Sequence, residues 1–222
     1  MNIGRIVDLS MPIGPATVVY PGDPVPSLSP ATTIEHDGYH VMHVRMGSHT
    51  GTHVDAPYHF DAAGPRIDEL DLRLFTGPGV VVDATRLAPR TPIDWHVLAP
   101  YAGQLRPGVI VLLRTGGSGH GATSAYLDHP FLDAGACRRL LDLGVRTVCT
   151  DALNIDETPG PGHPGEGYPV HHLIAEVGGV IGENFCNLNL IDFADPFISC
   201  LPIAIQGGDG APTRAVAMEL RP

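Results

Sequence analysis

One stretch organises the whole chain: Ser48-His49-Thr50-Gly51-Thr52-His53-Val54-Asp55-Ala56-Pro57-Tyr58-His59-Phe60. Three histidines and one aspartate fall within eleven residues here. Imidazole and carboxylate are the ligands that Zn²⁺, Mn²⁺ and Fe²⁺ share. Gly51, the threonines and Pro57 favour a strand that runs into a loop. Residues two apart on a strand point to the same face, so His53 and Asp55 can reach one ion. The pattern predicts a metal site; the alternative is a His-rich surface loop.

Two further histidines extend this candidate site. His49 lies four residues before His53, and a bend at Gly51, where no Cβ obstructs the backbone, can bring the two rings together. His59 lies beyond Pro57, where the metal or a substrate held by the metal can reach it. The residues alone therefore predict His49, His53 and Asp55 as ligands and leave the role of His59 open.

The run from His49 to Phe60 matches every fixed position of the signature H-x-G-T-H-x-D-x-P-x-H-F. In this it resembles the metal-dependent hydrolases of the cyclase family, which include bacterial kynurenine formamidases and isatin hydrolases. The ending G-x-D-G-x-P-x-R-A-V, from Gly207 to Val216, resembles the C-terminus of the same family. The resemblance therefore covers nearly the whole chain.

The resemblance implies a site built from distant parts of the chain. The family has a ligand histidine and, twelve residues later, a metal-bridging glutamate, at the positions of His171 and Glu183 here. His59 would act as acid/base, passing a proton from a metal-activated water to the leaving nitrogen. The implied ligands are five: His49 and His53 on one ion, His171 on a second, and Asp55 and Glu183 bridging. The resemblance further implies Zn²⁺, two ions per chain, with Mn²⁺ as the alternative.

Two positions depart from the family pattern. The run Tyr20-Pro21-Gly22-Asp23 resembles the W-P-G-D segment of kynurenine formamidases, whose Trp contacts the substrate ring. Tyr20 keeps an aromatic face and adds a hydroxyl, so we expect it to contact the substrate; packing beneath a turn is the alternative. The family pattern D-x-x-S-I-D corresponds to residues 151–156, where Asn154 replaces Ser. Asp151 and Asp156 are candidates for carboxylates behind the ligands, or for caps at the strand end.

Apolar runs and a helical segment alternate in the second half of the chain. Residues 130–143 are predicted as an amphipathic helix, and residues 170–185 as a helix followed by a strand. Three apolar runs are predicted as buried strands: residues 79–84, 109–116 and 145–151. This alternation favours an α/β fold, in a single domain of residues 1–222. The resemblance implies the swivelling β/β/α type, with an extended N-terminal arm that crosses between the subunits of a homodimer or homotetramer.

Composition narrows the possible partners and location. The formal net charge of −11 makes a nucleic-acid backbone an unsuitable partner. We find no run of apolar residues as long as a membrane span and no signal peptide pattern, so we expect a soluble protein. The four cysteines are scattered through apolar stretches and form no C-x-x-C pair: Cys137, Cys149, Cys186 and Cys200. We predict buried free thiols and a cytoplasmic location.

The predicted function is metal-dependent hydrolysis of an amide, formamide or lactam C–N bond in a small aromatic substrate. A covalent route is disfavoured because no G-x-S-x-G nucleophile motif is present. Three alternatives stay open. The same metal site could cyclise or dehydrate a polyketide-like substrate. His53-x-Asp55 with a distant histidine also resembles the facial triad of a mononuclear Fe(II) oxygenase. Third, the site could bind metal without catalysis.

Overall fold

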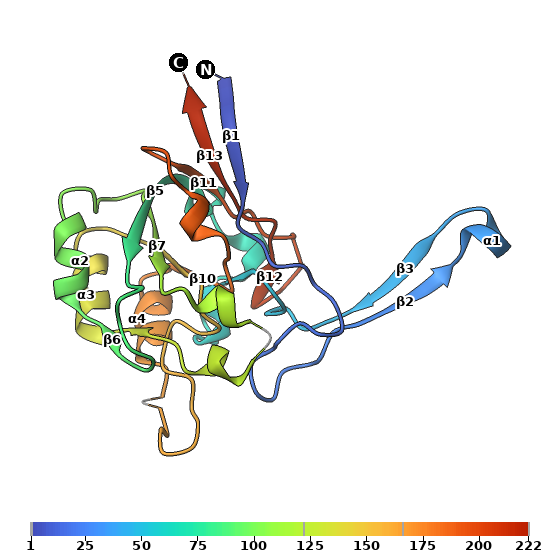
Figure 1. Ribbon diagram of the computed structural model, residues 1–222, viewed down its shortest axis with the longest axis horizontal. Coiled ribbons are helices and arrows are strands. Elements are labelled where there is room, and N and C mark those ends of the chain that lie inside the picture. The colour runs from blue at the N-terminus through green and yellow to red at the C-terminus, as the bar shows by residue number, and fades with distance from the viewer. Residues whose placement is uncertain (1, 122, 166, 222) are drawn as a thin grey trace.

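A nine-stranded mixed sheet forms the body of the protein in this computed structural model, which describes residues 2–121, 123–165 and 167–221 (Figure 1). The four central strands, β5, β7, β9 and β10, are parallel, and the outer strands join them in antiparallel fashion. Across the sheet the strands are β1 (Asn2–Asp8), β13 (Val216–Arg221), β11 (Phe197–Ser199), β5 (Thr76–Asp83), β7 (Ile110–Arg114), β9 (Thr147–Thr150), β10 (Val180–Glu183), β4 (His53–Asp55) and β12 (Gly210–Pro212). The predicted α/β class is confirmed.

Three helices pack on one face of the sheet: α2 (Trp95–Leu98), α3 (Ala134–Asp142) and α4 (Pro169–Glu176). Leu140 of α3 and Ile174 of α4 share a buried core with the central strands. The predicted helix over 130–143 is shorter in the structure. Phe131–Leu132 forms strand β8, which pairs with β6 (Pro92–Ile93), and the Asp133 side chain then accepts the Ala136 N–H to begin α3.

A second core lies on the other side of the sheet. It contains alternate residues of the central strands, such as Ile110 and Leu112, together with Val54 of β4, Phe75 and Phe185. Seven short 3₁₀ helices connect the elements in the described residues: η1 (Pro57–His59), η2 (Ile67–Glu69), η3 (Leu72–Leu74), η4 (Ala99–Tyr101), η5 (Gly117–His120), η6 (Ser124–Leu127) and η7 (Leu188–Leu190). In the described part of the chain, no helix has the length and apolar character needed to cross a membrane.

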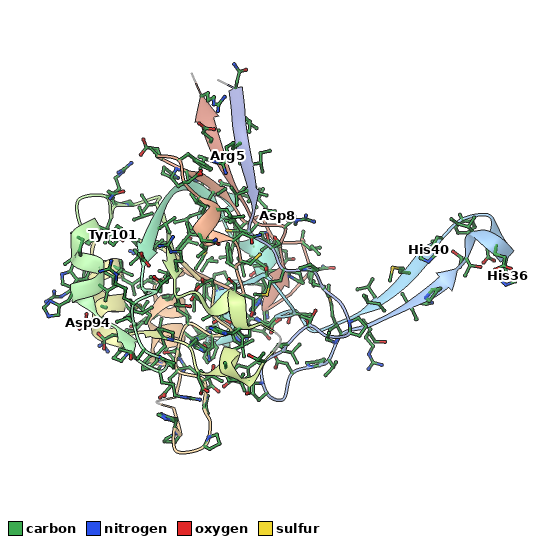
Figure 2. All side chains as sticks on the ribbon, in the orientation of Figure 1. Arg5, Asp8, His36, His40, Asp94 and Tyr101 are labelled. Carbon is green, nitrogen blue, oxygen red and sulfur yellow. The ribbon has the colours of Figure 1, made fainter. Side chains whose placement is uncertain are left out.

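A hairpin projects far from this body (Figure 1). Its strands β2 (Ser27–Thr32) and β3 (Val41–Arg45) are antiparallel and are joined through the helical turn α1 (Ile34–Asp37). His36 and His40 lie near its far end, well away from the sheet (Figure 2). Every residue of β3 is exposed. The expected N-terminal arm and its crossing between subunits stay predictions.

Candidate active site

Strand pairing brings the two halves of the site together. Strand β4 pairs with β10 so that His53 lies directly opposite Glu183, and cross-strand neighbours have Cβ atoms about 4.5–5.5 Å apart. His53 Nε2 is 3.6 Å from Glu183 Oε2 and 3.2 Å from Asp55 Oδ1. All three residues are buried. The register of two strands that are distant in sequence thus forms the centre of the site.

His49 joins this centre through a bend in the preceding loop. Gly51 has a φ of +67°, a backbone conformation that glycine adopts without steric cost. The bend places the rings of His49 and His53 with centroids 5.0 Å apart, and His49 Nδ1 lies 2.7 Å from Asp55 Oδ1. Gly210 leaves the necessary room, since a Cβ there would lie 2.7 Å from His49 Cε1. The predicted bend at Gly51 is confirmed.

His171 enters the site from the first turn of α4. Its Nε2 lies 3.5 Å from Asp55 Oδ2 and 3.5 Å from Glu183 Oε1. Asp156, itself buried, accepts the backbone N–H groups of Val170 at 3.0 Å and His171 at 3.1 Å, and also lies 2.7 Å from His171 Nδ1. Asp156 therefore orients the ring, as one of the two predicted alternatives had it, and it caps the start of α4 rather than the strand end.

Three histidines, His49, His53 and His171, form the inner part of the site. Each is held by a hydrogen bond to the ring nitrogen that faces away from Asp55 and Glu183. His53 Nδ1 donates to the carbonyl of Gly51 at 2.8 Å, and the partners of His171 Nδ1 and His49 Nε2 are Asp156 at 2.7 Å and Asp209 at 3.0 Å. An oxygen partner on one nitrogen orients the ring and directs the other nitrogen toward Asp55 and, for His53 and His171, also toward Glu183. The inner nitrogen offers a metal its lone pair once any proton there is displaced.

The donor set fits a divalent metal ion. His53 Nε2 and Asp55 Oδ2 are buried without a hydrogen-bond partner among the described residues, a costly arrangement unless a cation is bound. Potential ligand atoms of His53, Asp55 and Glu183 all lie within 4.8 Å of one another, and so do those of His49, Asp55 and His59. Neutral imidazoles with carboxylates and no thiolate are the ligands that zinc and manganese share.

Electrostatics of the protein atoms also favour a bound cation. Burial opposes protonation of His49, but Asp55 and Asp209 outweigh it and raise the pKa of His49 to about 10. Burial likewise opposes protonation of His171, yet Asp156, Asp55 and Glu183 raise its pKa well above the usual value. The carboxylates thus create a strongly negative field, and a divalent ion would replace the protons that this field attracts.

A cavity of about 230 Å³ opens onto these groups. Tyr20 lies on its wall, and its hydroxyl is hydrogen-bonded to that of Tyr168 at 2.7 Å. Tyr168 precedes α4 with a φ of +61°, a strained conformation for a bulky residue and one that occurs at functional sites. Phe60 completes an aromatic side, with its ring 4.4 Å from that of His171 between centroids. The cavity has room for a small aromatic ligand beside the metal-binding atoms.

His59 lies at the edge of the cluster. Its ring stacks on that of His49 with centroids 4.0 Å apart, and its side chain is 31% exposed, so it also borders the cavity. Its Nδ1 lies 3.6 Å from Asp209 Oδ2, the same oxygen that is hydrogen-bonded to His49. His59 is thus closer to solvent than the inner histidines and within reach of a carboxylate.

Sequence reasoning does not identify two residues of the site. The C-terminal signature contains Asp209 without assigning it a role, and no motif marks Tyr168. The turn before β12 was the available signal for Asp209, because β12 pairs with β4 and carries Asp209 to His49. Asp151, by contrast, has no hydrogen bond or ion pair with a histidine of the described chain and accepts from Thr115 and Gly116.

The comparisons with known proteins agree with this site. The model of a family described as "Putative cyclase" matches residues 7–157. Kynurenine formamidase of Bacillus cytotoxicus is 31% identical over 222 residues, covering 99% of this chain and all of that one. Kynurenine formamidase of Salinibacter ruber is 33% identical over 216 residues, covering 95% and 96%. The chain belongs to the cyclase family.

Solved structures share its fold. Isatin hydrolase A from Labrenzia aggregata, bound to benzyl benzoate, superposes with a TM-score of 0.86 at 25% identity, covering 98% of this chain and 94% of that one. A structure titled as a potential metal-dependent hydrolase with cyclase activity has a TM-score of 0.78 at 27% identity, covering 98% and 99%. The family and the α/β fold expected from the His49–Phe60 signature are confirmed.

Proposed function

We propose that this protein is a metal-dependent hydrolase that cleaves the C–N bond of an amide, formamide or lactam in a small aromatic substrate. One observation carries the proposal: buried imidazole and carboxylate atoms without protein partners converge beside an aromatic-walled cavity. The names of its relatives, kynurenine formamidase and isatin hydrolase, support the same reaction class. A small molecule is therefore the proposed partner.

The proposed metal ligands are His49, His53, Asp55, His171 and Glu183. The lone-pair nitrogens and the two central carboxylates support this set, because a carboxylate with two oxygens can serve two ions. We propose two Zn²⁺ ions per chain, with Mn²⁺ as the alternative. Such ions, when bound, lower the pKa of a water molecule and polarise a carbonyl group.

The protein's own residues divide the remaining work. His59 is the proposed proton carrier between water and the leaving nitrogen, and its position at the border of the cavity supports this role. Tyr20, Tyr168 and Phe60 would hold the substrate ring on the aromatic wall. The hydrogen bond between the two tyrosine hydroxyls joins the segment before the hairpin to the start of α4.

Metal analysis and a hydrolysis screen test this function together. The protein purified without chelator should contain zinc or manganese and should hydrolyse an aryl formamide or isatin; a chelator should abolish the activity and metal should restore it. Glu183→Gln should lower metal content and rate together, because bridging two cations requires anionic oxygens. The matched control is Glu176→Gln, an exposed residue of α4, which should change neither. Protein that neither retains a transition metal nor regains activity with one would contradict the proposal.

We also propose that the protein is a homodimer or homotetramer in the cytoplasm. A two-stranded hairpin is marginally stable in water, and this one exposes Val41, Met42 and Val44. A second subunit that covers the hairpin would bury these side chains. All four cysteines are unpaired, as is usual in a reducing compartment. Three of them are buried, but Cys186 is partly exposed, unlike the prediction. Sedimentation of the wild type and of a Val41→Lys/Val44→Lys variant tests the assembly.

A further inference from the structure

Two buried asparagines lie on the wall of the active-site cavity and have no role in the metal cluster. Asn154 follows strand β9 and Asn184 follows strand β10, which are adjacent and parallel. Both residues therefore border the cavity beyond the carboxyl ends of the parallel strands, where α/β sheets bind ligands. Each residue is only 3% exposed.

The hydrogen bonds of Asn184 leave one group unused. Its backbone N–H donates to Ala152 O at 2.9 Å, and its carbonyl accepts from Thr52 Oγ1 at 2.6 Å. Its side-chain Oδ1 accepts from the buried Tyr126 hydroxyl at 2.6 Å. That contact fixes the amide orientation, because the hydroxyl has no other acceptor in the described residues. The Nδ2 group of Asn184 then has no protein partner within residues 2–121, 123–165 and 167–221.

Asn154 repeats this arrangement. Its Oδ1 accepts the backbone N–H of Asp156 at 3.0 Å, and its Nδ2 has no hydrogen-bond partner in the described chain. The next residue, Ile155, donates its N–H to Glu183 Oε1 at 2.8 Å, which ties this turn to the metal cluster. Two amide NH₂ groups are thus held by their oxygens and left as free donors beside one cavity.

Amide donors that line a cavity and have no protein partner in the described residues can bind an oxygen atom of a ligand. A ligand that displaces water from such donors has to supply an acceptor itself, because a donor left without one costs about 1–3 kcal/mol. The charges around the cavity indicate whether the oxygen atom of the ligand belongs to a carboxylate or to a carbonyl group. Asp23 and Glu183 border it, and its described lining contains no lysine or arginine, so away from the bound metal a carboxylate of the ligand would lack a cationic partner. The neutral amides suit an uncharged carbonyl oxygen.

We infer that Asn154 and Asn184 form a donor pair that binds a carbonyl oxygen of the substrate. The inference rests on the proposed hydrolase function and adds two residues that contact the substrate. The positive φ of Asn184, +57°, is consistent with this role, because a residue held in that conformation often lies at a binding site. Asn154 stands where the family pattern has Ser, so the side chain that carries the donor at this position is longer in this chain.

The test removes the Asn184 amide without disturbing the backbone. Glycine adopts a positive φ freely, so Asn184→Gly keeps the turn, and adding Tyr126→Phe removes the hydroxyl that would otherwise lose its acceptor. The double variant is compared with Tyr126→Phe alone, which isolates the amide. Asn154→Asp provides the second test, since it keeps an oxygen for the Asp156 N–H and replaces only the NH₂ group. Metal content is measured in every variant.

Two readouts are used. The first is kcat/KM for formanilide, which has only the scissile carbonyl, and for 2-acetylformanilide, which has a second one. We expect a loss of roughly 10- to 1000-fold at unchanged metal content, the range seen when one donor to a reacting oxygen is removed. A loss on both substrates assigns the donors to the scissile carbonyl, and a loss on 2-acetylformanilide alone assigns them to the second. Unchanged rates on both, or a fall in metal content that tracks the rate, would overturn the inference.

The second readout separates this inference from the proposed function. Calorimetry measures the binding of 2-aminoacetophenone and of 2-ethylaniline, which has the same ring and lacks the carbonyl, to the metal-loaded protein. The double variant should bind the ketone at least about tenfold more weakly, a difference of about 1.4 kcal/mol, and bind 2-ethylaniline as Tyr126→Phe does. This result would support the donor pair even if neither formanilide were hydrolysed. Equal binding of the ketone by both proteins, together with an unchanged kcat/KM for formanilide, would refute it.

Discussion

Asp156 offers the sharpest test of the proposed ligand His171. Its two oxygens accept three N–H groups, from Val170, from the backbone of His171 and from His171 Nδ1. In Asp156→Asn one oxygen becomes an NH₂ group. If the remaining oxygen stays on Val170, the NH₂ group faces His171 and donates to Nδ1. The ring proton must then move to Nε2, the nitrogen that faces Asp55 and Glu183.

The expected magnitudes follow from these contacts. Two hydrogen bonds to a charged group are lost, at about 1.5–3 kcal/mol each, and the new bond from the NH₂ group offsets about 0.5–1.5 kcal/mol, so the free energy of unfolding of the metal-free protein should fall by about 1.5–5.5 kcal/mol. For a chain of this size each kcal/mol shifts Tm by about 2–4 °C, which gives a fall of roughly 3–22 °C. Loss of the hydrogen bond that orients a metal-binding histidine typically lowers metal affinity by about 10- to 100-fold.

Asp151→Asn is the matched control. Asp151 is equally buried and accepts from Thr115 N–H at 2.7 Å, Thr115 Oγ1 at 2.6 Å and Gly116 N–H at 2.9 Å, and it contacts no histidine of the described chain. Both variants should lose thermal stability, measured by calorimetry on metal-free protein. Only Asp156→Asn should lose zinc affinity, measured by competition with a chelator. Wild-type zinc affinity in Asp156→Asn, with a Tm loss like that of Asp151→Asn, would reduce Asp156 to a helix cap and remove the support for His171 as a ligand.

Three further outcomes are expected. His59→Ala should keep its metal by elemental analysis and slow hydrolysis by about 10²- to 10⁴-fold; metal loss in step with activity would contradict the proton-carrier role. Gly210→Ala should weaken zinc binding, because the new Cβ would lie 2.7 Å from His49 Cε1, whereas Gly103→Ala, in open space, should not; equal zinc affinity in both would contradict this. Burial lowers the pKa of His129 below 6.5, so the unfolded chain takes up its proton first and stability falls as the pH drops below 6.5. His129→Gln should remove up to about 1.4 kcal/mol per pH unit of that slope in urea unfolding, and an unchanged slope would refute the assignment.

Local patterns predicted most of the elements. Strands β7 and β9 lie inside the predicted runs 109–116 and 145–151, because β-branched residues buried on both faces leave a continuous apolar signal. The helix-then-strand prediction for 170–185 is confirmed by α4 and β10. Strand β5 begins at Thr76, earlier than predicted, because Thr76–Pro78 pairs with β11. That pairing depends on a partner far along the chain, and the local sequence does not contain it.

The same limit applies to the site. The spacing of His53 and Asp55 predicted a shared face, but only the resemblance connected them to His171 and Glu183. Strand register supplies the physical reason, since Glu183 lies opposite His53 on the neighbouring strand. The free amide of Asn184 depends on hydrogen bonds to Thr52, Ala152 and Tyr126, which no spacing rule predicts.

Strand β4 shows how the core determines the chemistry. It has three residues and lies between β10 and β12, so its side chains alternate between two environments. Val54 is fully buried in the second core, and His53 and Asp55 therefore both point to the opposite face. A slip of one residue would bury the two ligands among apolar side chains and leave a valine facing Glu183. The burial of Val54 therefore fixes the register, and the register places His53 and Asp55 at the site.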